Sequence, residues 1–181
     1  MKLFKYSGYN LTISEEALML KPFKDLWKRD KSKNKEQAMM ELGYIYFMED
    51  SRSDYQIYID KEERSKHIKL GEGIKESWKP DKLVLDAQEF YASFKSESAL
   101  LLEDIRVAIT KLREFIKTID LSATDDKGKP IYTLNTYTAT IKQIPELITS
   151  LDEAEKTIAK EAISQDKVRG SVDKAMFEDD L

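Results

Sequence analysis

The segment from residue 30 to residue 41 has residue types at the spacing of a calcium-binding loop. Four side chains with oxygen donors stand where such a loop places its ligands, at loop positions 1, 3, 5 and 12: Asp30, Ser32, Asn34 and Glu41. Position 6 of the loop needs glycine for a sharp turn, but this chain has Lys35 there. Lys31 and Lys33 add two more positive charges among the oxygens that would hold a dication. The sequence therefore argues against calcium, and we expect no metal site.

The same region is strongly basic. Between Lys21 and Lys35 the chain has seven lysines or arginines and two aspartates, which gives a local charge of +5, and Phe23 and Trp27 lie among them. Such a segment could contact phosphate groups, or its lysine stems could simply solvate a helix and the loop after it. The candidate contacts to DNA or to a neighbouring subunit are Lys24, Lys28, Arg29, Lys31, Lys33 and Lys35.

No other part of the sequence has the residues of a catalytic site. His67 is the only histidine, and it has no serine, cysteine or metal-ligand partner at a usable spacing. The aromatic residues between Tyr44 and Tyr58 could form a binding platform, but at helical spacing they are more typical of a core. We therefore expect a protein that is not an enzyme and that uses no cofactor.

The composition favours one compact, helical protein. The chain has 181 residues, of which 35% are charged and only six are glycine and four proline, a balance typical of long solvated helices. Its net charge of -4 gives no global field that would attract nucleic acid, so any such binding has to be local. It has no cysteine, and no apolar stretch approaches the roughly 20 residues that cross a bilayer. We expect neither disulfides nor contact with a membrane.

Local signals predict a β-hairpin and short helices in residues 1–80. Alternating apolar and polar residues on both sides of a Ser-Gly pair predict the hairpin at residues 2–13. Ser14 is the predicted N-cap of a short helical turn, and Asp60 is that of a helix at 61–70.

The longest apolar run of this part predicts its central helix. Asn34 and Gln37 have capping-box spacing, so the helix should start near Lys35 with Asn34 as its cap. Apolar residues then occupy nearly all of its faces up to Met48, which is typical of a helix enclosed by neighbours. Gly43 costs such a helix about 1 kcal/mol, which we attribute to close packing against another backbone.

Two long apolar seams predict an antiparallel helical hairpin, with helices at about 81–119 and 133–164. Pro145 should kink or break the second helix, because it removes a backbone donor. The seam residues of the two helices are spaced three, four or seven apart: Leu83, Ala87, Phe90, Phe94, Leu101, Ile105, Ala108, Leu112, Phe115 and Ile119, then Leu134, Tyr137, Ile141, Ile144, Ile148, Leu151, Ile158 and Ala162.

The predicted fold is therefore mainly α, with a small N-terminal β-hairpin, short helices and a long helical hairpin. We expect a single domain over residues 1–165, in which residues 1–80 precede the hairpin at 81–165. Residues 166–181 have no sustained period and end in acids. They are a flexible tail or an arm that docks on a neighbouring subunit through Met176 and Phe177.

One segment resembles a known family. Residues 23–55 read FKDLWKRDKSKNKEQAMMELGYIYFMEDSRSDY, and they resemble a segment of small virion structural proteins of tailed bacteriophages, the crAss-like phages in particular. The matching elements are an aromatic-x-x-Leu-Trp helix from Phe23, the Arg-Asp-Lys-Ser-Lys turn at 29–33, Tyr-Ile-Tyr-Phe at 44–47 and the Ser-x-Tyr exit at 53–55. The match covers roughly a fifth of the chain and brings no catalytic residue with it.

This resemblance implies a component of the virion that is made in the host cytoplasm. Its implied role is that of a ring or adaptor protein in the head-to-tail connector. The implied partners are copies of itself in a ring around the DNA channel, neighbouring proteins such as the portal or other tail proteins, and packaged DNA through phosphate contacts.

Two other functions remain open from the sequence. One is a nucleic-acid-binding packaging or regulatory protein that uses the basic segment 21–35. The other is a helical assembly chaperone or scaffold that is absent from the mature particle.

Overall fold

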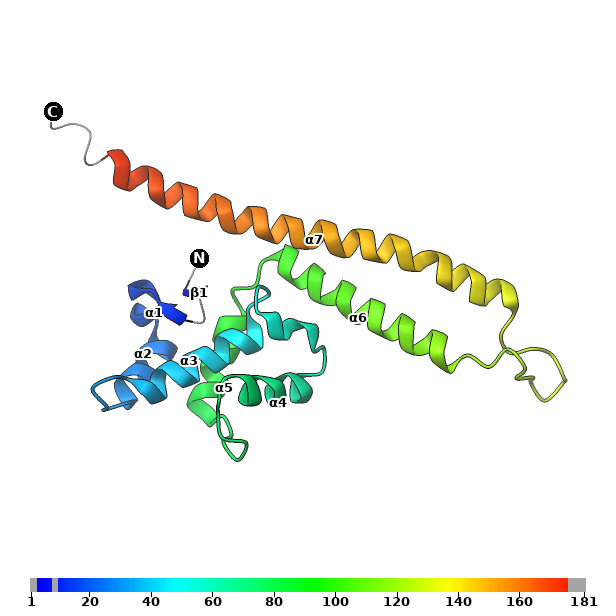
Figure 1. The fold of residues 1–181 in the computed structure, drawn as a ribbon, viewed down its shortest axis with the longest axis horizontal. Helices are drawn as coiled ribbons and strands as arrows, with labels where there is room; N and C mark the ends of the chain where they lie inside the picture. Colours follow the sequence, from blue (N-terminus) through cyan, green and yellow to red (C-terminus); the bar gives the residue numbers. More distant parts are fainter. Residues whose placement is uncertain (1–2, 8–9, 176–181) are drawn as a thin grey trace. The chain divides into compact units, whose positions relative to one another are not determined.

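The computed structural model describes residues 3–7 and 10–175, and it describes only the backbone of Ser7, Asn10, Ala162 and residues 165–175. The fold is mainly helical with a small β-hairpin at the N-terminus, as predicted (Figure 1). The chain divides into two compact units, unit 1 at Met1–Ser96 and unit 2 at Glu97–Leu181, where the sequence had led us to expect one domain.

Unit 1 begins with the predicted hairpin. Strand β1 (Phe4–Ser7) pairs antiparallel with β2 (Asn10–Ile13), and Phe4 lies opposite Ile13. Ser14 then caps the short helix α1 (Glu15–Met19), since its hydroxyl oxygen accepts a hydrogen bond from the N–H of Ala17 at 3.2 Å. The predicted cap of Ser14 is confirmed.

Helix α3 (Glu36–Glu49) is the centre of unit 1. It packs against α2 (Lys21–Arg29), the 3-10 helix η1 (Asp54–Ile57), α4 (Lys61–Gly71) and α5 (Lys82–Ala92). All ten residues from Glu41 to Asp50 are buried, so the prediction of an enclosed helix is confirmed. Its largest fully buried neighbours are Leu3, Phe4, Phe23, Leu26, Ile68 and Val84.

The predicted cap at Asp60 is confirmed, but the predicted reason for Gly43 is not. The Asp60 carboxylate accepts a hydrogen bond from the N–H of Glu63 at 2.8 Å and caps α4, as expected. Gly43, in contrast, does not lie against another backbone. A methyl group placed there would meet only the side chains of Leu11 at 3.6 Å and Phe47 at 3.9 Å, which are ordinary van der Waals distances. Our explanation of this glycine was wrong.

Unit 2 is an antiparallel pair of helices, α6 (Glu97–Thr118) and α7 (Leu134–Ala175), which lie side by side in Figure 1. The loop that connects them contains a β-bridge between Thr124 and Pro130. The expected single helix at 81–119 is divided into α5 and α6. After Ala92 the chain makes bonds of the tighter 3-10 type, from Phe94 N to Tyr91 O and from Lys95 N to Ala92 O. Lys95 then reaches the buried Glu49 of α3 at 2.8 Å, and this ion pair holds the turn.

The residues that join the two helices are only partly those of the predicted seams. The buried contact consists of Ala99, Leu102 and Ile105 on α6 and Ala154 and Ile158 on α7, with Ile109 and Leu151 beside it. The sequence could not choose between adjacent apolar stripes of one helix. The small side chains of Ala99 on α6 and Ala154 on α7 let the two helices approach closely. The stripes left exposed are Leu101, Ala108 and Phe115 on α6, and Leu134, Ile141 and Ile148 on α7.

Helix α7 also extends further than predicted. It continues through Pro145 without the break that we had allowed for. Proline removes only one hydrogen bond, that to the carbonyl of Ile141, and the helix continues on both sides of this position. The helix reaches Ala175, past residue 166, where we expected a tail to begin. The candidate docking residues Met176 and Phe177 lie outside the described residues.

Candidate functional site

The turn between α2 and α3, at residues 30–35, is built around Asp30. Its carboxylate accepts hydrogen bonds from the N–H of Ala38 at 3.0 Å and from the N–H of Ser32 at 2.8 Å. These bonds, first that of Ala38, lower the pKa of Asp30 to about 2. Asp30 therefore caps the N-terminal end of α3, although it lies eight residues before Ala38 in the chain. Asn34 does not cap the helix, which corrects our prediction, and its amide reaches only Glu36 at 3.4 Å.

Lys35 has a structural role in the same turn. It is the residue just before α3 and has a left-handed backbone with φ of 54°. Its ammonium group donates to the carbonyl oxygens of Trp27, at 3.3 Å, and of Asp30. It also lies 5.9 Å from the centre of the Trp27 ring, a cation–π distance. This side chain thus closes the turn onto α2.

Arg29 joins three helices. Its guanidinium pairs with Glu41 of α3 at 2.6 Å and with Asp81, the N-cap of α5. The hydrogen bond to Glu41 is the largest cause of a raised pKa of Arg29. Burial alone would raise the pKa of Asp81, but its hydrogen bonds from Val84 and Arg29 outweigh burial and lower it. Arg29 and Lys35 are therefore held by the fold.

The other four candidate contacts are exposed: Lys24, Lys28, Lys31 and Lys33. Within the described part of the chain none of them has an ion pair or a side-chain hydrogen bond. The two aromatic residues of the basic segment are not available as stacking platforms. Phe23 is fully buried, and Trp27 is half-buried beside Lys35.

The residues at calcium-loop spacing do not converge. The Asp30 oxygens accept backbone N–H groups, and Glu41 is buried against Arg29 and accepts a hydrogen bond from Gln37 at 2.9 Å. No group of three or more acidic or histidine side chains among the described residues is arranged to hold a metal ion.

A second polar cluster lies at the C-terminal end of α3, and no pattern in the sequence predicted it. Asp50 is 8% exposed, and it accepts two hydrogen bonds from the Arg52 guanidinium and one from the Tyr91 hydroxyl, the last at 2.6 Å. Burial would raise the pKa of Asp50, but the bonds and charge of Arg52 and the bond from Tyr91 together lower it. Burial, and then the nearby Asp50 charge, raise the pKa of the Tyr91 hydroxyl. Every charge is paired, so this cluster stabilises the fold and offers no free base.

The last carbonyl groups of α3 are also satisfied by side chains. Ser53 and Gln56 donate to the carbonyl of Phe47, and Gln56 and Arg64 donate to that of Met48, at distances from 2.8 to 3.3 Å. A helix end buried in this way needs such partners. The Ser-x-Tyr exit of the resembling segment, where Ser53 also accepts from Tyr55 N at 3.3 Å, is therefore part of a helix cap.

His67 and most of the aromatic set have structural positions. The His67 ring stacks on Tyr58 with centroids 3.9 Å apart. Tyr44, Tyr46 and Phe47 are all at most 5% exposed and belong to the core, as predicted.

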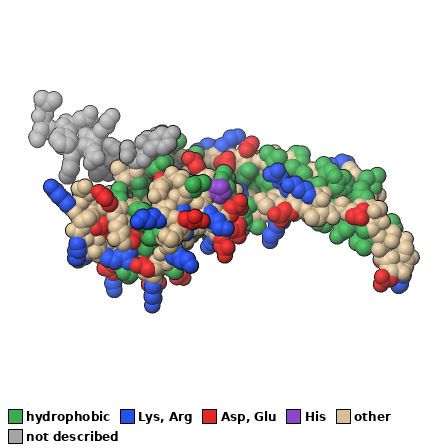
Figure 2. All heavy atoms as spheres, turned by 60° about the horizontal axis from the view of Figure 1, so that its bottom comes forward, with side chains coloured by type: hydrophobic (Ala, Val, Ile, Leu, Met, Phe, Trp, Pro, Cys, Tyr) green, Lys and Arg blue, Asp and Glu red, His purple; other side chains and the backbone are tan. Residues whose placement is uncertain are grey.

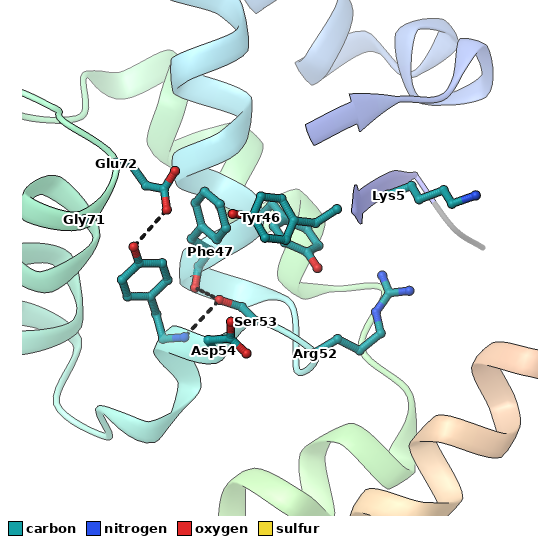
Figure 3. Close-up of a pocket in the computed structure, with 10 residues that line it drawn as sticks. Lys5, Tyr46, Phe47, Arg52, Ser53, Asp54, Gly71 and Glu72 are labelled. Atoms are coloured by element: carbon teal, nitrogen blue, oxygen red, sulfur yellow. Dashed lines mark hydrogen bonds between the residues drawn. The ribbon is translucent and has the colours of Figure 1, made fainter. Parts of the chain in front are cut away.

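A surface pocket of about 540 Å³ lies in unit 1 (Figure 3). Lys5 and Arg52 are on one side of it and Glu72 on the other, where Glu72 accepts a hydrogen bond from Tyr55 at 2.8 Å. The lining residues are Lys5, Tyr6, Tyr46, Phe47, Arg52, Ser53, Asp54, Tyr55, Gly71 and Glu72. Both signs of charge are present, and none of the lining side chains that the structure describes is a buried polar group without a partner. The pocket therefore indicates no particular ligand class.

The surface of unit 2 has large apolar side chains exposed on both of its helices. Figure 2 shows hydrophobic side chains gathered along the hairpin of α6 and α7. In the exposed stripes Leu134 is 67% exposed, Leu101 55%, Ile148 47%, Ile141 39% and Phe115 36%. Their spacing of seven residues keeps each stripe on one side of its helix.

Comparison with known protein families, with curated protein sequences and with solved structures gives no match for this chain. None of the described helices has a stretch long and apolar enough to cross a bilayer.

Proposed function

We propose that this protein is a structural subunit of a bacteriophage virion, a ring or adaptor component of the head-to-tail connector. Copies of the chain assemble through the exposed apolar stripes of unit 2, and the subunit performs no chemistry. The observation that carries the assembly is the pair of exposed apolar stripes, Leu101, Ala108 and Phe115 on α6 and Leu134, Ile141 and Ile148 on α7.

The stripes favour assembly on energetic grounds. Five large side chains are each about half exposed, and full burial of such a side chain contributes about 1.5–3 kcal/mol. Covering all five would thus contribute about 4–7 kcal/mol per copy. A helix with three apolar positions in each heptad, instead of the two of a simple coiled coil, is typical of bundles with more than two helices. A hairpin with such helices is well suited to lateral packing between copies.

The connector role itself rests on the resemblance of residues 23–55. In this chain that segment covers α2, α3 and the start of η1. Its recognisable residues hold unit 1 together, since Phe23 and Leu26 are in the core and Arg29 joins three helices. The resemblance therefore concerns a folded unit rather than a reacting site, as expected for a structural subunit.

The assembly is tested by sedimentation velocity of the full chain over a range of concentrations. The wild type should form oligomers, and the double substitution Leu101→Gln and Ile148→Gln should weaken them while circular dichroism stays unchanged. Met19→Gln and Leu70→Gln make the matched control, because these residues of unit 1 are 76% and 81% exposed. The control should associate like the wild type.

The place in the virion is tested by mass spectrometry of purified particles. A structural subunit should be present in several copies per particle. Its absence from mature particles, together with association in solution, would favour the assembly chaperone or scaffold. A stable monomer that is also absent from particles would refute the proposal.

A further inference from the structure

We propose that unit 1 binds the phosphate backbone of double-stranded nucleic acid through one surface of α2 and the turn after it. This lysine patch consists of Lys21, Lys24, Lys28, Lys31 and Lys33, all of which are exposed. The inference is independent of the assembly through unit 2.

The patch follows from the geometry of α2. Lys21, Lys24 and Lys28 are separated by three and four residues, so they lie on the same side of the helix. Phe23 and Leu26 are on the opposite side and are fully buried. Lys21 and Lys28 are about 10 Å apart along the helix axis, which matches about three phosphates of one strand at ~3.4 Å each.

The turn directly after α2 adds two exposed lysines, because the fold holds its acid inward. Asp30 is 6% exposed and faces the N–H groups of Ser32 and Ala38. Lys35 fixes the turn through Trp27 and Asp30, and this leaves Lys31 and Lys33 in solvent. The other acid between residues 21 and 35 is the half-buried Asp25, which is four residues from Lys21 and three from Lys28 and therefore borders the patch. The positive charge is thus concentrated on the outer surface.

The composition of the patch selects its partner. Between residues 21 and 35 no large apolar side chain is strongly exposed, whereas the centre of a protein interface is apolar and poor in lysine. Binding of single strands uses exposed aromatic rings for stacking, but Phe23 is buried and Trp27 is covered by Lys35. Exposed lysines whose aromatic neighbours are buried or half-buried suit phosphate groups, and contacts to phosphates do not depend on the base sequence.

The test is fluorescence anisotropy of a labelled duplex DNA with the full chain, from about 50 to about 200 mM salt. Four or five lysine contacts predict a slope of log K against log salt of about -3.5 to -4.5. The affinity for the duplex should therefore fall by about 100- to 500-fold over this salt range. The patch variant combines Lys24→Gln, Lys28→Gln, Lys31→Gln and Lys33→Gln. It should bind more than about tenfold more weakly and have a slope near -1.

The matched control removes four exposed lysines elsewhere in unit 1: Lys61→Gln, Lys66→Gln, Lys75→Gln and Lys79→Gln. It carries the same change in net charge and should retain the affinity and slope of the wild type. Equal losses in both variants, or no binding at about 50 mM salt, would overturn the inference. Much tighter binding of the single strand of the same sequence would also contradict it. If the patch variant loses self-association and not DNA binding, the patch contacts a neighbouring subunit instead.

Discussion

The hydrogen bond from Tyr91 to Asp50 should contribute strongly to the stability of unit 1. Tyr91→Phe removes only the hydroxyl, because the ring keeps its contacts with Phe4 and Phe23 at 5.0 and 6.2 Å between centroids. The bond is 2.6 Å long, is buried and ends on a charged carboxylate. Such a bond is worth about 1.5–3 kcal/mol, so the free energy of unfolding should fall by that amount.

Urea unfolding followed by tryptophan fluorescence measures this change in unit 1 alone, since both tryptophans, Trp27 and Trp78, belong to it. At an m value of ~1.5 kcal/mol/M the midpoint should fall by about 1–2 M, with m unchanged. Tyr58→Phe is the control, because the Tyr58 hydroxyl has no partner among the described residues and its ring stacks on His67. A change below about 0.5 kcal/mol in Tyr91→Phe, or an equal loss in the control, would refute the assigned role of the bond.

Three other substitutions test the packing and the capping of unit 1. Gly43→Ala should stabilise it by about 1 kcal/mol and raise its Tm by about 4–8 °C in calorimetry, because α3 gains helix propensity and the methyl group has room; a lower Tm would contradict this. Gly71→Ala should instead lower the Tm, since its methyl group would lie 2.1 Å from the Tyr55 hydroxyl oxygen and displace that ring. The low pKa of Asp30 means that its carboxylate stabilises the fold above pH ~4 and that this contribution is lost as the pH falls towards 2. Asp30→Asn should therefore unfold earlier than the wild type in urea at pH 6, and the difference should shrink at pH ~2.5; a constant difference would argue against the cap.

The basic segment shows how far residue types alone can predict a site. The sequence placed six cations together as candidate contacts. Two of them, Arg29 and Lys35, are bound to groups of the fold. Arg29 could not be foreseen there because its partners Glu41 and Asp81 belong to other helices. Lys35 could not be foreseen there because it reaches the carbonyls of Trp27 and Asp30 only through the folded turn. The spacing of Lys24 and Lys28 against the buried Leu26 was readable in the sequence, since it depends only on the helical period.

Short-range signals also predicted most of the fold. The caps at Ser14 and Asp60, the hairpin and the enclosed helix α3 were all readable in the sequence. Each depends on bonds or apolar periodicity within a few consecutive residues, which sequence displays directly. The cap of α3 was missed because it is not local in this sense. Asp30 reaches Ala38 across a turn, whereas the capping box at Asn34 offered a cap within a few residues.

The sequence by itself therefore determined the helical class, the N-terminal hairpin and the absence of cysteine chemistry. Only the tertiary structure decided that the long helix ends before Lys95, that α6 meets α7 through Leu102 rather than Leu101, and that Asp50 is buried with Tyr91. In each of these cases the choice depends on a partner distant in sequence. The free energy that favours one arrangement over the other comes from packing and charge pairing, and these exist only once both segments are in place.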